Sequence, residues 1–310
     1  MNEPSYINLY KTGELKRRKE LLYKKLKSCD LCPHRCMVDR TEKPGYCKVR
    51  DMTRISEYVL YPGEEPPLTG KTGAGGVFFS NCNMNCIYCQ NFKFSQEGFG
   101  KEITVERLSE IFLEIQNIKK AVNLDLITAT AYLPFIFDAL IIAIEKGFRL
   151  PIVWNTSSYE SVETLELLDG VVDIYLADIR YTSNAIGKKY SGVKDYWTVC
   201  KQAIFEIYRQ IGSDFILGDE NILKRGIILR ILVLPSNIQQ AIQALKFIKY
   251  DLSDSIAVSL MDQYVPVNRT ANFPEMDRFL KKSEYEAVVE VMQELELSNG
   301  WVQEHKLIDD

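Results

Sequence analysis

Three cysteines within eight positions are the residues of this 310-residue chain that point most directly to chemistry. Cys82, Cys86 and Cys89 have the spacing C-x3-C-x2-C. Three closely spaced thiolates can each ligate one iron of a 4Fe-4S cubane and leave the fourth iron open to a small chelating molecule. A structural zinc needs four ligands, and this loop offers three with no His nearby. The spacing therefore favours an iron–sulfur cluster with one open iron.

A second cysteine group lies upstream and has the spacing C-x2-C-x3-C-x10-C, over Cys29, Cys32, Cys36 and Cys47. Four thiols can complete a tetrahedral zinc site or fully ligate a second iron–sulfur cluster, and the sequence does not separate the two. A zinc would tie down a segment with little core of its own, whereas a cluster could relay electrons. His34 lies inside this group and is interpreted as a bystander.

These cysteines must be positioned by secondary structure, and a regular pattern of it begins after residue 76. There, apolar runs of strand length alternate with longer stretches of helical period. Strands are expected at 77–80, 124–130, 152–156, 172–178, 227–234 and 255–261. Helices are expected near 104–120, 133–147, 161–169, 195–211, 237–250 and 283–297, with caps at Thr104, Ser161 and Ser283.

Six strands that alternate with helices indicate parallel βαβ units. No G-x-G-x-x-G follows a strand into a helix, which leaves a dinucleotide-binding sheet without support. The three-cysteine loop directly follows the first of these strands, and ligand chemistry in β/α barrels gathers at the carboxyl ends of strands. We therefore expect an α/β fold, a partial six-stranded (β/α)6 barrel with a Cys-rich N-terminal extension.

The expected domains are a basic helix plus Cys-rich metal-binding extension over 1–75, the barrel over 76–265, and a C-terminal helical segment over 266–310. Residues 30–75 are rich in Cys, Pro and Gly and are expected to be dominated by loops. The basic helix over 11–27 is interpreted as a solvated, capping helix. Contact with nucleic acid is the less favoured alternative.

Composition indicates an ordinary globular protein, with 46% hydrophobic and 26% charged residues and a net charge of −4. The amino terminus is polar and Lys-rich, unlike a secretory signal. The longest apolar stretch, 131–144, contains Pro134 and Asp138 and is too short to cross a bilayer. The cysteine spacings favour metal binding in a reducing compartment over disulfides, so we expect a cytoplasmic protein without membrane association. Cys200, alone in an expected helix, is interpreted as a core residue.

The three-cysteine spacing, with an aromatic residue just before the last Cys, resembles the signature of the radical S-adenosylmethionine (SAM) superfamily. From about Cys29 to Tyr285 the chain resembles the uncharacterised relatives of the pyruvate formate-lyase activating enzyme. The motifs that carry this resemblance include Cys29-x-x-Cys32-Pro33, Gly63-Glu64-Glu65-Pro66-Pro67, Phe78-Phe79-Ser80-x-Cys82-Asn83, Cys89-Gln90-Asn91, Asn155-Thr156-Ser157 and Ser259-Leu260-Met261-x-Gln263-Tyr264.

The resemblance implies an enzyme that reductively cleaves SAM to a 5′-deoxyadenosyl radical, which abstracts hydrogen from a substrate. It also implies a one-electron donor such as flavodoxin or ferredoxin. The leading hypothesis for the substrate is a glycine of a partner protein, and the first alternative is a small metabolite or peptide. An electron-transfer or nucleic-acid-binding metal module, and a scaffold that has lost catalysis, are alternatives of other classes, because a scaffold does not fix function.

SAM needs polar groups near the cluster, and the resemblance suggests which ones supply them. Tyr88 could pack on adenine, and Thr128 and Thr130, at the end of the second strand, could bind the amino group of SAM. Asn155 could hold ribose hydroxyls or substrate. Arg230 lies within an apolar strand, where its partner is either the SAM carboxylate or an internal carboxylate.

Asp178 and Arg180 are the candidate catalytic residues, since they lie two positions apart at one strand exit and could face the same side. They could equally pair with each other. Arg180 stands where the family commonly has Lys, and Ala131 stands where the family pattern Thr-Pro-Thr-His-Tyr has His. Glu64 and Glu65 are interpreted as residues that fix a turn or a cap.

Overall fold

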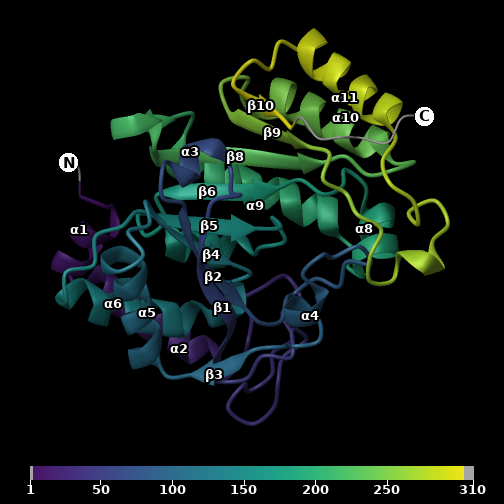
Figure 1. Ribbon diagram of the computed structural model, residues 1–310. Helices are drawn as coiled ribbons and strands as arrows, with labels where there is room; N and C mark the ends of the chain where they lie inside the picture. Colours follow the sequence, from purple (N-terminus) through teal and green to yellow (C-terminus); the bar gives the residue numbers. More distant parts are fainter. Residues whose placement is uncertain (1–2, 304–310) are drawn as a thin grey trace.

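The computed structural model describes residues 3–303. Its centre is one large, mostly parallel sheet (Figure 1). Six parallel strands pair in the order in which they follow one another, and all six lie at the expected positions. They are β2 (Ala74–Phe79), β4 (Leu124–Ile127), β5 (Ile152–Thr156), β6 (Ile174–Asp178), β8 (Leu223–Leu232) and β9 (Ala257–Met261). The edges of this sheet are β3 and β10, which do not pair, so the partial β/α barrel is confirmed.

Four further strands lie outside the expected set. Strand β1 (Thr53–Tyr61) is antiparallel to β2, β3 (Lys101–Ile103) is antiparallel to β1, and β10 (Gly300–Val302) is parallel to β9. A short hairpin joins β7 (Ile216–Leu217) to β8. Loops dominate 30–75, as expected, but this segment also contains β1, which extends the barrel sheet. The C-terminal segment likewise contains a strand besides its helix. The division into three domains stays a prediction.

The helices lie outside the sheet, and each expected helix is present with ends within a few residues of the expected ones. These are α5 (Val105–Asn117), α6 (Leu133–Glu145), α7 (Val162–Leu165) with a following 3-10 turn, α9 (Tyr196–Ile211), α10 (Ile238–Phe247) and α11 (Lys282–Glu294). The others are α1 (Tyr6–Lys11), α2 (Glu14–Lys25), α3 (Pro66–Thr69), α4 (Phe92–Ser95) and α8 (Asn184–Ser191). Between residues 3 and 303, no helix has the length and apolar character needed to traverse a bilayer.

One of the three expected caps is confirmed. Thr104 accepts a hydrogen bond from the backbone N–H of Arg107 at the start of α5, over 3.2 Å. Ser161 precedes α7, but its hydroxyl donates to the carbonyl oxygen of Leu31 instead (3.1 Å). Helix α11 begins before Ser283, and the side chain of Glu284 satisfies a backbone N–H at its start.

The basic N-terminal segment forms α1 and α2, and α2 packs against α6. Leu15 and Leu22 are fully buried. The Lys19 ammonium and the Tyr23 hydroxyl both contact the carboxylate of Asp138 on α6, over 3.2 and 3.0 Å. These contacts match the interpretation of α2 as a capping helix. Its leucines are buried, and its polar side chains Lys19 and Tyr23 bind α6.

Candidate functional site

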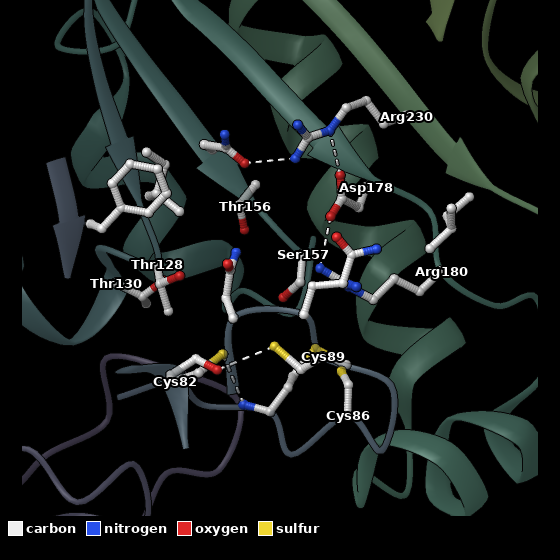
Figure 2. Close-up of a pocket in the computed structure, with 18 of the residues that line it drawn as sticks. Cys82, Cys86, Cys89, Thr128, Thr130, Thr156, Ser157, Asp178, Arg180 and Arg230 are labelled. Atoms are coloured by element: carbon white, nitrogen blue, oxygen red, sulfur yellow. Dashed lines mark hydrogen bonds and ion pairs between the residues drawn. The ribbon is translucent and has the colours of Figure 1, made fainter. Parts of the chain in front are cut away.

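One cavity of about 810 Å³ lies at the carboxyl ends of the parallel strands. Figure 2 shows the loop of Cys82, Cys86 and Cys89 on one side of it, facing side chains from the strand ends. Of the predicted site residues, all but Cys36 line this cavity. The sheet thus brings together residues that lie far apart in the sequence.

The three-cysteine loop is held in place by hydrogen bonds to distant segments. The backbone N–H of Asn81 donates to the carbonyl oxygen of Phe94 (2.7 Å), and that of Ile87 donates to the carbonyl oxygen of Tyr190 at the end of α8 (2.8 Å). The amide of Gln96 donates to the carbonyl oxygen of Cys86 (2.7 Å). The loop backbone is therefore fixed from three sides.

Each of the three sulfurs has a hydrogen-bonding group beside it. The backbone N–H of Met84 donates to Cys82 Sγ (3.3 Å), and Ser191 Oγ donates to Cys86 Sγ (2.9 Å). Cys89 Sγ lies 3.2 Å from the hydroxyl of Ser95. N–H and O–H groups aimed at sulfur favour the thiolate, the form that ligates a metal.

Burial opposes ionisation of the Cys82 and Cys86 thiols. It raises the pKa of Cys82 to about 12 and also raises the pKa of Cys86. A buried thiolate needs a positive charge or a metal beside it. In the described part of the chain, no three His, Cys, Asp or Glu side chains are placed to hold a single metal ion. A cubane makes a different demand, because each thiolate ligates its own iron. The hydrogen-bonding groups beside all three sulfurs fit that role.

Asp178 lies between two arginines. Arg230 stands opposite Asp178 in the register of β6 and β8, and its Nε donates to Asp178 Oδ1 over 2.7 Å. Arg180 donates to Asp178 Oδ2 over 2.8 Å. Arg230 also contacts the carboxylate of Glu64 (3.3 Å) and the amide oxygen of Asn155 (2.7 Å). The sequence left open whether these residues form internal ion pairs, and in the structure they do (Figure 2).

Arg180 keeps one group free despite its ion pair with Asp178. Its Nε is buried and has no hydrogen-bond partner within residues 3–303. The guanidinium also lies near Cys86 and Tyr88, with which it interacts electrostatically. An orphaned buried donor next to the cysteine loop fits an anionic group of a bound ligand, because leaving it unpaired is costly.

The sequence analysis did not single out Glu160, a buried carboxylate that lines the cavity. Its Oε1 accepts hydrogen bonds from Thr130 and Thr156, both over 2.7 Å, while its Oε2 has no partner in the described chain. Burial raises its pKa. The only sequence signal is its position, a few residues after the third parallel strand.

Thr128, which follows β4 directly, has a φ of +62°. A β-branched residue in this left-handed region is strained, and such strain persists only where the surroundings enforce it. Asn81 and Ser158, after the neighbouring strands β2 and β5, also have positive φ values of 66° and 59°. Three adjacent strand exits are therefore held in unusual conformations around the cavity.

Tyr88 is almost fully buried among other tyrosines. Its hydroxyl accepts a hydrogen bond from Tyr181 (2.8 Å), and its ring centroid lies 5.8 Å from that of Tyr264. Tyr88 is also one of the residues that line the cavity. Cys200, by contrast, is fully buried in α9 and does not line the cavity, which confirms it as a core residue.

Glu64 and Glu65 make tertiary contacts and provide no helix cap. Glu65 precedes α3 without capping it. Its carboxylate accepts hydrogen bonds from Ser259 on β9 (3.0 Å) and Trp301 on β10 (2.6 Å). Glu64 faces Arg230 in the cavity. The interpretation as a cap is therefore wrong for the Glu65 side chain, and the interpretation as turn residues stays a prediction.

The N-terminal cysteine group opens onto the same cavity, through Cys29, Cys32 and Cys47. Cys36 lies close to Cys47, because a Cβ on Gly45 would lie 3.3 Å from Cys36 Sγ and 3.7 Å from Cys47 Sγ. His34 Nε2 is hydrogen-bonded to the carbonyl oxygen of Asn83 (2.6 Å), next to Cys82. The two cysteine groups are thus direct neighbours, and His34 bridges them.

Comparison with known families agrees with this geometry. A family model described as the radical SAM superfamily matches residues 77–247, more than half of the chain, and the protein belongs to that superfamily. Its fold, a partial β/α barrel with the cysteine loop after the first parallel strand, is the one that the sequence led us to expect.

Two similar proteins from Methanocaldococcus jannaschii are described as uncharacterized. MJ0674 is 29% identical over 96% of this chain and 82% of its own length. MJ0808 is 26% identical over 53% of each chain. Among solved structures, Streptococcus suis SuiB is similar with a TM-score of 0.46 and 12% identity, over 73% of this chain. The chain spans about half the length of SuiB, of which SAM-bound and precursor-peptide-bound structures are also known.

Membership of the family implies a 4Fe-4S cluster and SAM as cofactors. The residues around the cavity fit both groups. Three sulfurs have hydrogen-bonding groups beside them, and two buried polar atoms, Arg180 Nε and Glu160 Oε2, have no partner within residues 3–303. The Arg180 guanidinium is cationic and suits the carboxylate of SAM. The Glu160 carboxyl group suits the amino group of SAM.

Proposed function

We propose that this radical SAM enzyme abstracts a hydrogen atom from a glycine of a partner protein. The observation that carries the proposal is the mouth of the cavity, where exposed amide side chains of Gln90, Asn91 and Gln263 stand beside the cysteine loop. A glycine offers no side chain, so an enzyme must recognise it through its backbone. Side-chain amides supply both the donors and the acceptors that a peptide backbone needs.

The inner part of the cavity supplies the groups for SAM. Arg180, through its free Nε, binds the carboxylate of SAM, and Glu160, through its free Oε2, accepts a hydrogen bond from the amino group. Thr130 holds Glu160 in place. Tyr88 offers an apolar ring face to adenine, and the Asn155 amide, fixed by Arg230, lies where ribose hydroxyls can reach it.

The bound cofactors supply a hydrogen-abstracting radical, and the protein supplies orientation and exclusion of competing reactions. Asp178 acts here as a positioning residue, because its carboxylate fixes both Arg180 and Arg230. Its sequence assignment as a catalytic residue stays a prediction. The exposed amides of Gln90, Asn91 and Gln263 in the lining favour a substrate with a peptide backbone.

Deuterium transfer tests the proposal. The reconstituted enzyme is incubated without oxygen with SAM, a flavodoxin-class reductant and uncharged peptides whose central glycine carries deuterium at Cα. We expect deuterated 5′-deoxyadenosine, detected by mass spectrometry, and an organic radical on the peptide by electron paramagnetic resonance. Peptides with alanine at that position serve as the control. Formation of unlabelled 5′-deoxyadenosine alone, or transfer only from a small metabolite, would contradict a glycine substrate.

Two variants separate recognition from SAM binding. Gln263→Glu places a charge at the mouth and is expected to raise the KM for peptide about tenfold with little change in the affinity for SAM. Arg180→Gln removes the proposed partner of the SAM carboxylate and is expected to weaken SAM binding by about 10–100-fold. Arg180→Lys keeps the charge and should retain part of that affinity.

A further inference from the structure

The segment that follows the cysteine loop packs against it and exposes an aromatic side chain. The side-chain amide of Gln96 donates to the carbonyl oxygen of Cys86 (2.7 Å), and the hydroxyl of Ser80 donates to the carbonyl oxygen of Phe99 (2.7 Å). Phe99 itself is 68% exposed and does not line the cavity. A large apolar side chain therefore faces solvent next to the loop, on a surface separate from the cavity.

The Cys-rich extension joins this surface. Lys48 Nζ donates to the carbonyl oxygen of Gln96 (2.9 Å), and the guanidinium of Arg54 donates to that of Gly98 (3.2 Å). Figure 1 shows the loops of residues 30–50 beside β3. Lys48 has a φ of +62°, a strained conformation that persists only where the surroundings enforce it. Tyr46, two residues before it, is 49% exposed.

We call the surface of segments 46–52 and 93–101 the extension face. Four of its exposed residues are cationic and three are large and apolar: Lys48, Arg50, Lys93, Lys101, Tyr46, Met52 and Phe99. None of the seven lines the cavity. The neighbouring cations Lys27, Arg35 and Arg54 are paired with carboxylates, whereas none of these four forms an ion pair within residues 3–303.

The charge of the extension face is opposite to that of the whole protein. Its four cations stand against two carboxylates in the same segments, Asp51 and Glu97, which gives a net charge of +2, whereas the chain carries −4. A local excess of positive charge on an acidic protein attracts an acidic partner and raises the rate of encounter. The face is therefore suited to a negatively charged partner.

We propose that the extension face docks the one-electron donor of this enzyme, an acidic carrier protein of the flavodoxin or ferredoxin class. Aromatic and Met side chains are enriched at protein interfaces, and polar residues form their rims. A nucleic acid would use the cations alone, because its backbone is recognised by charge. The exposed Tyr46, Met52 and Phe99 favour a protein. The inference rests on radical SAM chemistry, which consumes an electron, and not on the identity of the substrate.

The position of the face allows electron supply while substrate is bound. The proposed substrate occupies the cavity mouth, so a carrier protein must approach from elsewhere. At the extension face, Lys48 contacts Gln96 and Gln96 contacts Cys86, so two hydrogen bonds link the surface to a cysteine of the loop. On transfer the carrier loses one electron and the enzyme gains it, and no bond forms or breaks.

Charge reversal tests the docking surface. The reconstituted enzyme is titrated calorimetrically with oxidised flavodoxin and with oxidised 2Fe-2S ferredoxin, so that no electron moves. Replacing Lys93 and Lys101 with Glu should weaken binding of the carrier about tenfold at low ionic strength, and added salt should remove most of the difference. Lys16→Glu with Lys24→Glu on α2 is the matched control, since both lysines are exposed and unpaired within residues 3–303. Equal losses in the two double variants, or no binding of either carrier to the wild type, would overturn the proposal.

The apolar part of the face has a separate test. Phe99→Ala should weaken carrier binding by up to about tenfold at every ionic strength, because an aromatic contact is not screened by salt. Ile118→Ala is the control, since Ile118 is 75% exposed but lies at the end of α5. Unchanged binding by the Phe99 variant would remove Phe99 from the interface.

Reduction kinetics complete the test without SAM or peptide, so their failure would leave the glycine proposal untouched. Stopped-flow reduction by the reduced carrier should be slower in the Lys93 and Lys101 variant. Photoreduced deazaflavin, a small reductant that needs no docking surface, should reduce this variant and the wild type at the same rate. Equal slowing with both reductants would trace the effect to a damaged cluster site and contradict docking. Binding of an RNA duplex at these lysines, without carrier binding, would assign the face to nucleic acid instead.

Discussion

The side chain of Ser191 donates a hydrogen bond to the sulfur of Cys86 over 2.9 Å, although the two residues lie 105 positions apart. Ser191 ends α8, and Tyr190 beside it accepts from the backbone of the cysteine loop. A helix distant in sequence therefore sets both the position and the electronic environment of one sulfur. Hydrogen bonds to sulfur ligands are a main determinant of the reduction potential of a cluster.

Replacing Ser191 with Ala should shift the potential of the SAM-binding cluster to a more negative value, because a donor that stabilises charge on Cys86 is lost. The measurement is a redox titration followed by electron paramagnetic resonance, with the N-terminal group removed by Cys47→Ala. Ser109→Ala is the matched control, since Ser109 is equally buried but its hydroxyl has no partner in the described chain. Equal potentials in the two serine variants would show that the hydrogen bond has no electronic role.

Replacing Cys86 with Ala should abolish 5′-deoxyadenosine formation, because a cluster that loses one of three protein ligands is not retained in its active form. The measurement is the yield of 5′-deoxyadenosine by chromatography after incubation with SAM and reductant. Cys200→Ala serves as the control, since that thiol is buried in α9 away from the cavity. It should cost about 1 kcal/mol of stability and leave the yield unchanged. Comparable yields from the Cys86 variant and the wild type would remove the three-cysteine loop from the mechanism.

Local patterns of sequence predict the barrel well because each of its six strands is a short apolar run between helices of clear period. Strand β1 is not predicted from local patterns, because it has no such apolar run. Its residues Thr53–Tyr61 are mostly half-buried, with polar and apolar side chains mixed on both faces. Such an antiparallel strand is defined by its pairing with β2, and pairing is a tertiary property.

The sequence predicts the site residues whose spacing alone indicates their chemistry. It does not predict the residues whose role depends on hydrogen-bond partners from distant segments. The spacing of Cys82, Cys86 and Cys89 is by itself enough to indicate a cluster. Glu160 carries no motif, and only the fold shows that Thr130 and Thr156 hold its carboxylate. Arg40 is similar, since its burial among cysteines and carbonyl oxygens depends on how the N-terminal extension folds onto the barrel.

Replacing Arg230 with Met should strongly destabilise the protein, because it leaves the buried carboxylate of Glu64 without its counter-charge and removes one of the two arginines paired with Asp178. Removal of one partner of a buried ion pair costs about 3–5 kcal/mol, measurable by urea unfolding. Arg107→Met is the matched control. Arg107 also contacts two carboxylates, Glu110 and Glu114, but it is a surface residue, so its loss should cost at most about 1 kcal/mol. Equal losses in the two variants would mean that the interior network contributes no more than a surface one.

Replacing Asp125 with Asn should stabilise the protein, and increasingly so as the pH rises. Asp125 lies buried in β4, its Oδ1 has no partner among the described residues, and burial raises its pKa well above the usual 3.8. A carboxyl with a raised pKa in the folded state stabilises that state while it is protonated in both states, and this contribution is lost as the pH rises through the folded pKa. Asn cannot ionise, so its advantage in the free energy of unfolding should grow as the pH rises from about 4, the usual pKa of Asp, towards the raised pKa of the folded state. Glu114→Gln gives the opposite sign, because the hydrogen bond from Arg107 lowers the pKa of Glu114, so this variant should be less stable than the wild type throughout that range. An advantage of Asp125→Asn that shrinks with rising pH would show that Asp125 is ionised and stabilising in the folded barrel.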